Sequence, residues 1–116
     1  MTLETVRELC ISLKGVTECF PFNEDTLVFK VMDKMFVLMS LEKRRLSVKS
    51  DPENAIRQRE AYAWVYPAYH MSKTHWNMID LDGRENDRLV REWILDSYHL
   101  VVASLPRKLQ AELGKL

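Results

Sequence analysis

A chain of 116 residues is long enough for one domain with a shared hydrophobic core and too short for several. Apolar residues make up 47% and charged residues 29%, as in an ordinary globular protein, and scarce Gly and Pro argue against a flexible linker. Seventeen basic and seventeen acidic residues cancel, which excludes a global field that would draw the whole molecule to nucleic acid or membrane. We therefore expect a single domain over residues 1–116.

The N-terminal stretch and the cysteines indicate a cytoplasmic protein. Residues 1–5, MTLET, carry an acid early and are not followed by a long apolar run, so no secretory signal is expected. The longest apolar runs, such as residues 35–39, are too short to cross a bilayer, and we expect no membrane contact. Cys10 and Cys19 lack metal-binding spacing, so both are expected to be free thiols.

The first predicted element is an amphipathic helix. Apolar residues recur at three- and four-residue spacing from Leu3 to Leu13, which lines one face of a helix. Thr2 can cap its start and Gly15 can end it.

Three or four strands are predicted next. Residues 26–31 and 35–41 are rich in β-branched, aromatic and other apolar side chains, and Asp33-Lys34 between them predicts a hairpin turn. Residues 20–22, FPF, are predicted to form part of an earlier strand or the bend that leaves it. Residues 45–49 alternate between polar and apolar side chains, as in a half-buried strand.

The second half of the chain predicts two long helices and one strand. Asp51-Pro52-Glu53 supplies a cap, a proline for the first position and an acid for the dipole, so a helix should run to about Tyr62. Residues 63–74 are predicted to be irregular, and residues 76–81 a strand. An apolar stripe over residues 89–101 predicts a long amphipathic helix that stops before Pro106, with a short final helix over residues 108–113.

This order of elements predicts an α+β fold, in which an antiparallel sheet of about five strands carries the N- and C-terminal helices on one face. Trp93 lies in the middle of the last apolar stripe and is expected to be buried. The alternating rhythm of a doubly wound nucleotide-binding fold is missing. A Gly-rich phosphate loop is missing too, since the three glycines are isolated.

Residues that could carry catalysis or hold a metal form no recognisable constellation. His70 and His75 are five residues apart and His99 comes much later, whereas a catalytic zinc site needs three converging protein ligands. There is no G-x-S-x-G elbow, and neither cysteine is adjacent to a histidine. We therefore expect a non-enzymatic protein with no metal and no cofactor.

The strongest local signal is a central basic and aromatic segment. Residues 43–75 carry a net charge of +4, against −3 for residues 1–42 and −1 for residues 76–116. Cations meet phosphates, and flat rings stack on unpaired bases. The candidate nucleic-acid-binding residues are Lys43, Arg44, Arg45, Lys49, Tyr69, His70, Lys73 and His75. The alternative for this segment is a solvated surface, with rings such as Trp64 and Trp76 anchoring a loop on the sheet.

Two stretches resemble the signatures of the MmcQ/YjbR-like family, namely residues 20–31, FPFNEDTLVFKV, and residues 69–77, YHMSKTHWN. The tail over residues 97–106, SYHLVVASLP, is similar to that family's ending. Asn23 and Ser72 depart from the pattern, in which Gly and Asn are expected. The resemblance covers nearly the whole chain and implies a CyaY-like fold, akin to frataxin. It also implies DNA binding, the description commonly given to members, and implies no catalytic residues.

The leading prediction is therefore a DNA-binding module that uses the eight candidate residues. The rival prediction is a domain that binds a protein or a small molecule in a groove formed by Tyr69–Trp76. A frataxin-like role in metal handling comes third. That role would rest on fold alone, and the first helix offers only Glu4 and Glu8 on its acidic side.

Overall fold

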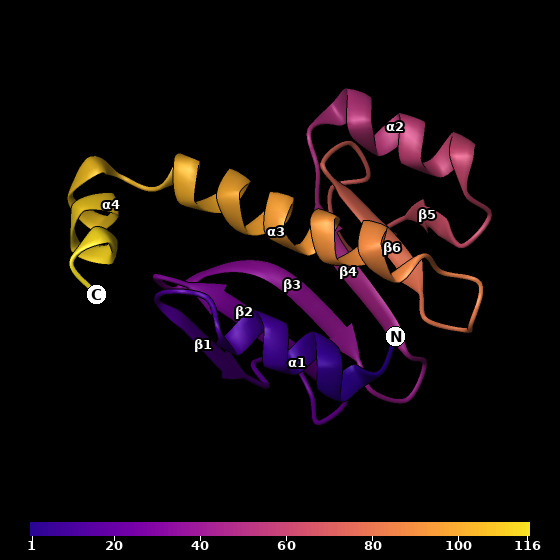
Figure 1. Ribbon diagram of the computed structural model, residues 1–116, viewed down its shortest axis with the longest axis horizontal. Coiled ribbons are helices and arrows are strands. Elements are labelled where there is room, and N and C mark those ends of the chain that lie inside the picture. Colours follow the sequence, from indigo (N-terminus) through magenta and orange to yellow (C-terminus); the bar gives the residue numbers. More distant parts are fainter.

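One sheet of six strands and four helices make up the protein, which a computed structural model describes over all residues 1–116 (Figure 1). The strands are β1 (Val16–Cys19), β2 (Thr26–Val31), β3 (Lys34–Ser40), β4 (Arg45–Lys49), β5 (Val65–Pro67) and β6 (Trp76–Asp80). The helices are α1 (Leu3–Ile11), α2 (Pro52–Ala61), α3 (Asp87–Ser104) and α4 (Arg107–Gly114). The strand order is β1-β2-β3-β4-β6-β5 and every neighbouring pair is antiparallel. The predicted α+β class is confirmed, with one strand more than expected.

Three helices begin at a capping side chain. The side chains of Thr2, Asp51 and Asn86 each accept a hydrogen bond from the backbone N–H three residues later. Helix α1 ends at Ile11, earlier than the glycine signal indicated. Gly15 instead has a φ of 72° and lies in the turn into β1, where its conformation suits a residue without a side chain.

The hairpin between β2 and β3 closes one residue earlier than the sequence predicted. Met32 and Asp33 occupy the turn with φ values of 48° and 69°, and β3 begins at Lys34. Two consecutive left-handed residues match the twist of the flanking strands, as in type I′ turns. The prediction missed this turn because Met32 lacks the Asn or Gly that usually marks it.

A β-bulge between β2 and β3 lets α3 bind the backbone of the sheet. The register shifts between Phe29 and Lys30, so Phe36 has no residue opposite it. Ser97 of α3 fills the gap, because its hydroxyl donates to the Phe36 carbonyl (2.6 Å) and accepts from the Lys49 N–H (2.9 Å). Ser97 is fully buried, so these bonds fix the middle of α3 over β3 and the end of β4.

Helices α1 and α3 cover one face of the sheet and share a single core with it (Figure 1). Val6 and Cys10 of α1 join the same buried cluster as Trp93 of α3. Trp93 is 7% exposed and stacks on Trp64, with ring centroids 5.5 Å apart. Both the shared face of the helices and the burial of Trp93 are confirmed. Leu113 of α4 closes the end of this core, and no helix is both long enough and apolar enough to span a membrane.

One short segment differs from the prediction, and in a second the structure decides between two predicted alternatives. Residues 63–74 were expected to be irregular but contain β5, which pairs with β6 at the edge of the sheet, beside α2. Pro67 is compatible with β5 because it ends an edge strand, where a missing N–H is tolerated. Residues 20–22 were expected in a strand or the bend after it. They form the bend, since β1 ends at Cys19, and both phenylalanines are exposed.

Candidate nucleic-acid interface

The eight candidate residues lie at two opposite ends of β4. The turn end consists of Lys43, Arg44, Arg45, Asp80, Asp82 and Arg84. The loop end consists of Lys49, Tyr69, His70, Lys73 and His75. Arg45 is the first residue of β4 and Lys49 the last, so the two ends are separated by about 13 Å of extended chain. The structure therefore does not bring all the predicted cations to one place.

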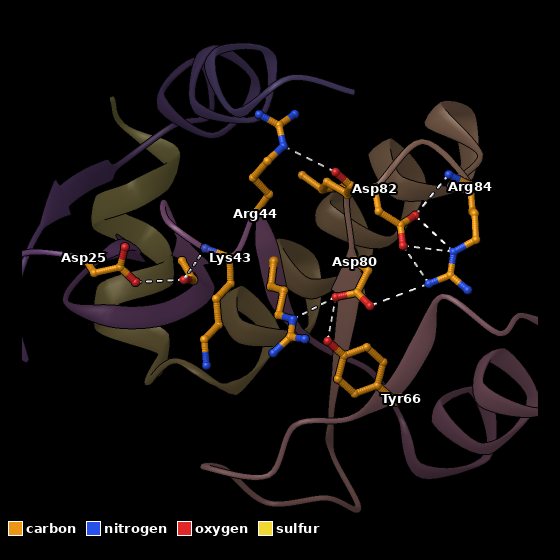
Figure 2. Close-up of polar contacts among 10 residues, drawn as sticks. Asp25, Lys43, Arg44, Tyr66, Asp80, Asp82 and Arg84 are labelled. Carbon is orange, nitrogen blue, oxygen red and sulfur yellow. Dashed lines mark hydrogen bonds and ion pairs between the residues drawn. The ribbon is translucent and has the colours of Figure 1, made fainter.

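Acidic groups pair with two cations of the turn end, Arg45 and Arg84. Arg45 Nε donates to Asp80 Oδ1 (2.8 Å), and the Tyr66 hydroxyl donates to the same oxygen (2.6 Å). Arg84 lies 2.7 Å from Asp82 and 3.7 Å from Asp80, as Figure 2 shows. Burial, followed by the hydrogen bond to Asp80, raises the pKa of Tyr66 well above its ordinary value. Arg45 is thus committed to a network within the protein.

Lys43 and Arg44 lie in a turn that hydrogen bonds hold in shape. The Asp25 carboxylate accepts from the Ser40 hydroxyl (2.7 Å) and from the Glu42 N–H (2.7 Å), and these bonds lower the pKa of Asp25. Arg44 Nε donates to the backbone carbonyl that follows β6 (3.4 Å), a contact drawn in Figure 2. Both residues therefore lie in the turn that precedes β4, and the Arg44 side chain is held there by a backbone carbonyl.

The loop between β5 and β6, residues 68–75, is anchored to α2. Backbone hydrogen bonds across Ala68–Met71 and Ser72–His75 close two consecutive turns. Arg59 of α2 donates to the Lys73 carbonyl (2.9 Å) and to Asn77 Oδ1 (2.9 Å). Asn77 is fully buried, and its amide donates to the backbone and a side chain of α2. In the sequence, Arg59 counted only as one of the basic residues of the 43–75 segment, and no local signal distinguished its role as an anchor of the loop.

The loop end presents an exposed ring among unpaired cations. Tyr69 is 60% exposed, with Lys73 Nζ 5.4 Å from its ring centroid and the Tyr66 ring at 6.3 Å. Neither Lys73 nor Lys49 forms an ion pair, and both histidines of the loop are exposed. Trp76 is buried, as expected under the alternative prediction that some rings of this segment anchor the loop on the sheet. The loop end can therefore meet phosphates and an unpaired base together.

The other predicted sites have less support in the geometry. Three surface cavities have volumes of about 360, 400 and 430 Å³, and none is lined by Tyr69–Trp76, where a groove was predicted. No group of three or more His, Cys, Asp or Glu side chains is arranged to hold a metal ion. His70 and His75 lie in the loop, whereas His99 is on α3.

The fold places this chain in a class of small α+β proteins, in which helices cover one face of an antiparallel sheet. In this chain the β5–β6 loop is also tied to α2. This chain belongs to the YjbR family, whose model matches residues 11–100. Two asparagines of the signature stretches hold local structure, and one of them, Asn23, stands where the expected pattern has Gly. The buried Asn77 holds α2, and Asn23 Oδ1 accepts from the N–H groups of Asp25 (2.9 Å) and Thr26 (2.8 Å), which starts β2.

Similar proteins support the family and the fold. The uncharacterized protein YbdF of Escherichia coli O157:H7 is 36% identical over 108 residues, which cover 90% of this chain and 88% of YbdF. The uncharacterized protein YjbR of Escherichia coli K12 is 29% identical over 118 residues, which cover 97% and 100%. Among crystal structures, Deinococcus radiodurans DR2400, with a DUF419 domain, is 36% identical with a TM-score of 0.91, covering 97% of this chain and 88% of that one. A Pseudomonas syringae protein is 25% identical with a TM-score of 0.74, covering 86% and 98%.

Proposed function

We propose that this protein is a DNA-binding module that prefers single strands and binds them through the loop end. The observation that carries the proposal is the exposed ring of Tyr69 beside Lys73, in a loop whose cations have no acidic partner. Every base has a flat face, so one exposed ring can stack on any unpaired base, whereas bases inside a duplex are already stacked. This combination favours binding that depends little on sequence.

Electrostatics favours the loop end over the turn end. A phosphate that approaches Arg45 must compete with Asp80, whose carboxylate is already hydrogen-bonded to it at 2.8 Å. A phosphate that approaches Lys49 or Lys73 displaces only water and mobile ions, since neither lysine is paired. With zero net charge on the whole chain, the attraction is local, so we expect modest affinity that falls steeply with salt.

The proposal places this activity in the cytoplasm. Cys10 and Cys19 are both free thiols, on α1 and β1. Burial raises the pKa of Cys10 to about 12, so this thiol stays protonated and unreactive in the folded protein. A reducing compartment keeps the half-buried Cys19 from forming a disulfide.

The test is fluorescence anisotropy with a labelled single strand and the matching duplex, each at several salt concentrations. We expect wild type to bind the single strand more tightly than the duplex at low salt. Lys49→Ala combined with Lys73→Ala should weaken binding to every sequence. It should also reduce the log–log salt slope for single strands by about 0.7 for each lost phosphate contact. Tyr69→Ala should weaken single-strand binding by about 1–3 kcal/mol and duplex binding much less.

The matched control removes the same charge from the turn end. Lys43→Ala with Arg44→Ala also deletes two cations, but the proposal predicts an affinity close to that of wild type. Equal losses from the two double variants would mean that the loop end has no special role. No binding of either DNA form by wild type at low salt would refute the proposed function.

A further inference from the structure

A second group of unpaired cations lies at the end of the strands where the loop end also lies. The cavity of about 430 Å³ is lined by Lys30, Lys34 and Lys49, and Asp33 is the one acidic residue in its wall. None of the three lysines forms an ion pair, and none donates a side-chain hydrogen bond within the protein. The cavity thus carries a net charge of about +2 that no contact within the protein neutralises.

The register of the sheet brings these lysines together from three strands. Lys30 of β2 is paired with Met35 of β3, and Lys49 ends β4 on the other side of β3. Neighbouring strands lie about 4.8 Å apart, so the backbones that carry Lys30 and Lys49 are separated by about 10 Å. Lys34 begins β3 at the adjoining turn. Long, flexible side chains at this spacing can direct their ammonium groups at one anion.

A simpler role for the lysines would be to neutralise the carbonyls at the end of α3, since this helix ends at the cavity. Three of the last four carbonyls already have other partners. The Val101 carbonyl accepts from the Ser104 hydroxyl (2.7 Å), the Val102 carbonyl from a backbone N–H (3.1 Å), and the Ala103 carbonyl from Gln110 (3.4 Å). The helix end therefore leaves the three ammonium groups available.

Lys49 belongs both to this cavity and to the loop end. The residue after it, Ser50, donates its backbone N–H to the His75 carbonyl (2.8 Å), so the end of β4 and the 68–75 loop are tied together. We propose that the Lys30–Lys34–Lys49 cavity binds a phosphate group of the strand whose base stacks on Tyr69. This inference rests on the proposed function, and it names phosphate as the chemistry that the second subsite recognises.

Inorganic tripolyphosphate tests the cavity without any base. In wild-type protein, titration followed by amide NMR shifts should perturb residues 30–35, Lys49 and residues 101–104 first. Lys30→Ala with Lys34→Ala should weaken tripolyphosphate binding by about tenfold. Lys108→Ala with Lys115→Ala is the matched control, because it removes two exposed lysines, one on α4 and one directly after it, that also lack ion pairs. This control should bind as wild type does.

The same variants then separate the inference from the proposed function. Lys30→Ala with Lys34→Ala should lower single-strand affinity and reduce the salt slope by about 0.7, for the one phosphate contact that the cavity supplies. If this variant binds DNA normally while the Lys49 and Lys73 variant does not, the cavity inference fails and the proposed function stands. If tripolyphosphate binds in the cavity but no DNA binds at low salt, the phosphate site stands and the proposed function fails. Shifts spread evenly over all surface lysines would overturn the phosphate site.

Discussion

The turn end and the loop end of β4 carry similar residues in different electrostatic settings. Arg45 at the turn end is paired with Asp80 at 2.8 Å, and Arg84 with Asp82 at 2.7 Å. Lys49 at the loop end has no acidic partner, and its neighbour in the loop, Lys73, lies against an exposed ring. A phosphate would compete with carboxylates at one end and only with water and mobile ions at the other.

This difference shows that a local charge count does not identify a binding surface. Residues 43–75 carry +4, but the acid that pairs with Arg45, Asp80, comes from β6, outside that segment. Pairing of β4 with β6 brings Asp80 opposite Arg45, and Lys49 opposite an apolar residue, Trp76. The sheet register therefore decides which cations remain available.

The largest expected effect compares a buried ring of the core with the exposed ring of the loop end. Trp93 is 7% exposed and stacked on Trp64, so Trp93→Ala should lower the free energy of unfolding by about 3–5 kcal/mol. Tyr69 is 60% exposed, so Tyr69→Ala should change it by about 0.5 kcal/mol or less. Urea unfolding of both variants checks the contrast. A large loss for Tyr69→Ala would show that its ring supports the fold and is not free to stack.

The next largest effect concerns Arg59, which anchors the 68–75 loop to α2. Arg59→Ala leaves the buried Asn77 Oδ1 without its donor, which should cost about 1–3 kcal/mol in urea unfolding. Arg57→Ala is the matched control on the same helix. Arg57 makes only exposed contacts, with Glu53 and Asn54, so its loss should cost about 0.5 kcal/mol or less. Faster amide exchange over residues 68–75 in the Arg59 variant alone would show that α2 orders the loop.

Much of the fold was predictable because its local signals agree with one another. The caps at Thr2 and Asp51, the apolar stripe through Trp93 and the alternation along β4 each specify an element by periodicity or hydrogen bonding. The misses have specific causes. The turn at Met32 lacks a characteristic residue, and β5 is only three residues long, too short for a period-two pattern to stand out.

The candidate site was less predictable because it depends on contacts between distant segments. The sequence could indicate that residues 69–75 combine rings with cations, but not that Arg59 holds this loop from 14 residues away. Likewise, Lys30 and Lys34 precede the basic segment, in a region of net negative charge. They reach the loop end only because β2, β3 and β4 are neighbours in the sheet.

A smaller difference in unfolding free energy is expected between the loss of a paired cation and the loss of an unpaired one. Arg45→Ala should cost about 0.5–1 kcal/mol of unfolding free energy, since the pair with Asp80 is only partly shielded from water. Lys49→Ala should cost less, because its backbone N–H, not its side chain, holds Ser97. Thermal unfolding at low and high salt measures both. The difference should shrink at high salt. Its persistence there would mean that the position of the Arg45 guanidinium over the Tyr66 ring contributes more than the ion pair with Asp80.

The smallest effect is a pH dependence confined to the turn end. Burial and the hydrogen bond to Asp80 raise the pKa of Tyr66 above its unfolded value of about 10. A raised folded pKa means that the protonated phenol contributes stability below about pH 10, and that this contribution is lost as the pH rises further. Ultraviolet titration of wild type and Tyr66→Phe should assign the late ionisation to Tyr66. Asp80→Asn should move it to lower pH, because the amide no longer carries the charge that opposes ionisation. An unchanged Tyr66 titration in Asp80→Asn would mean that burial alone sets its pKa, and that Asp80 serves Arg45 only.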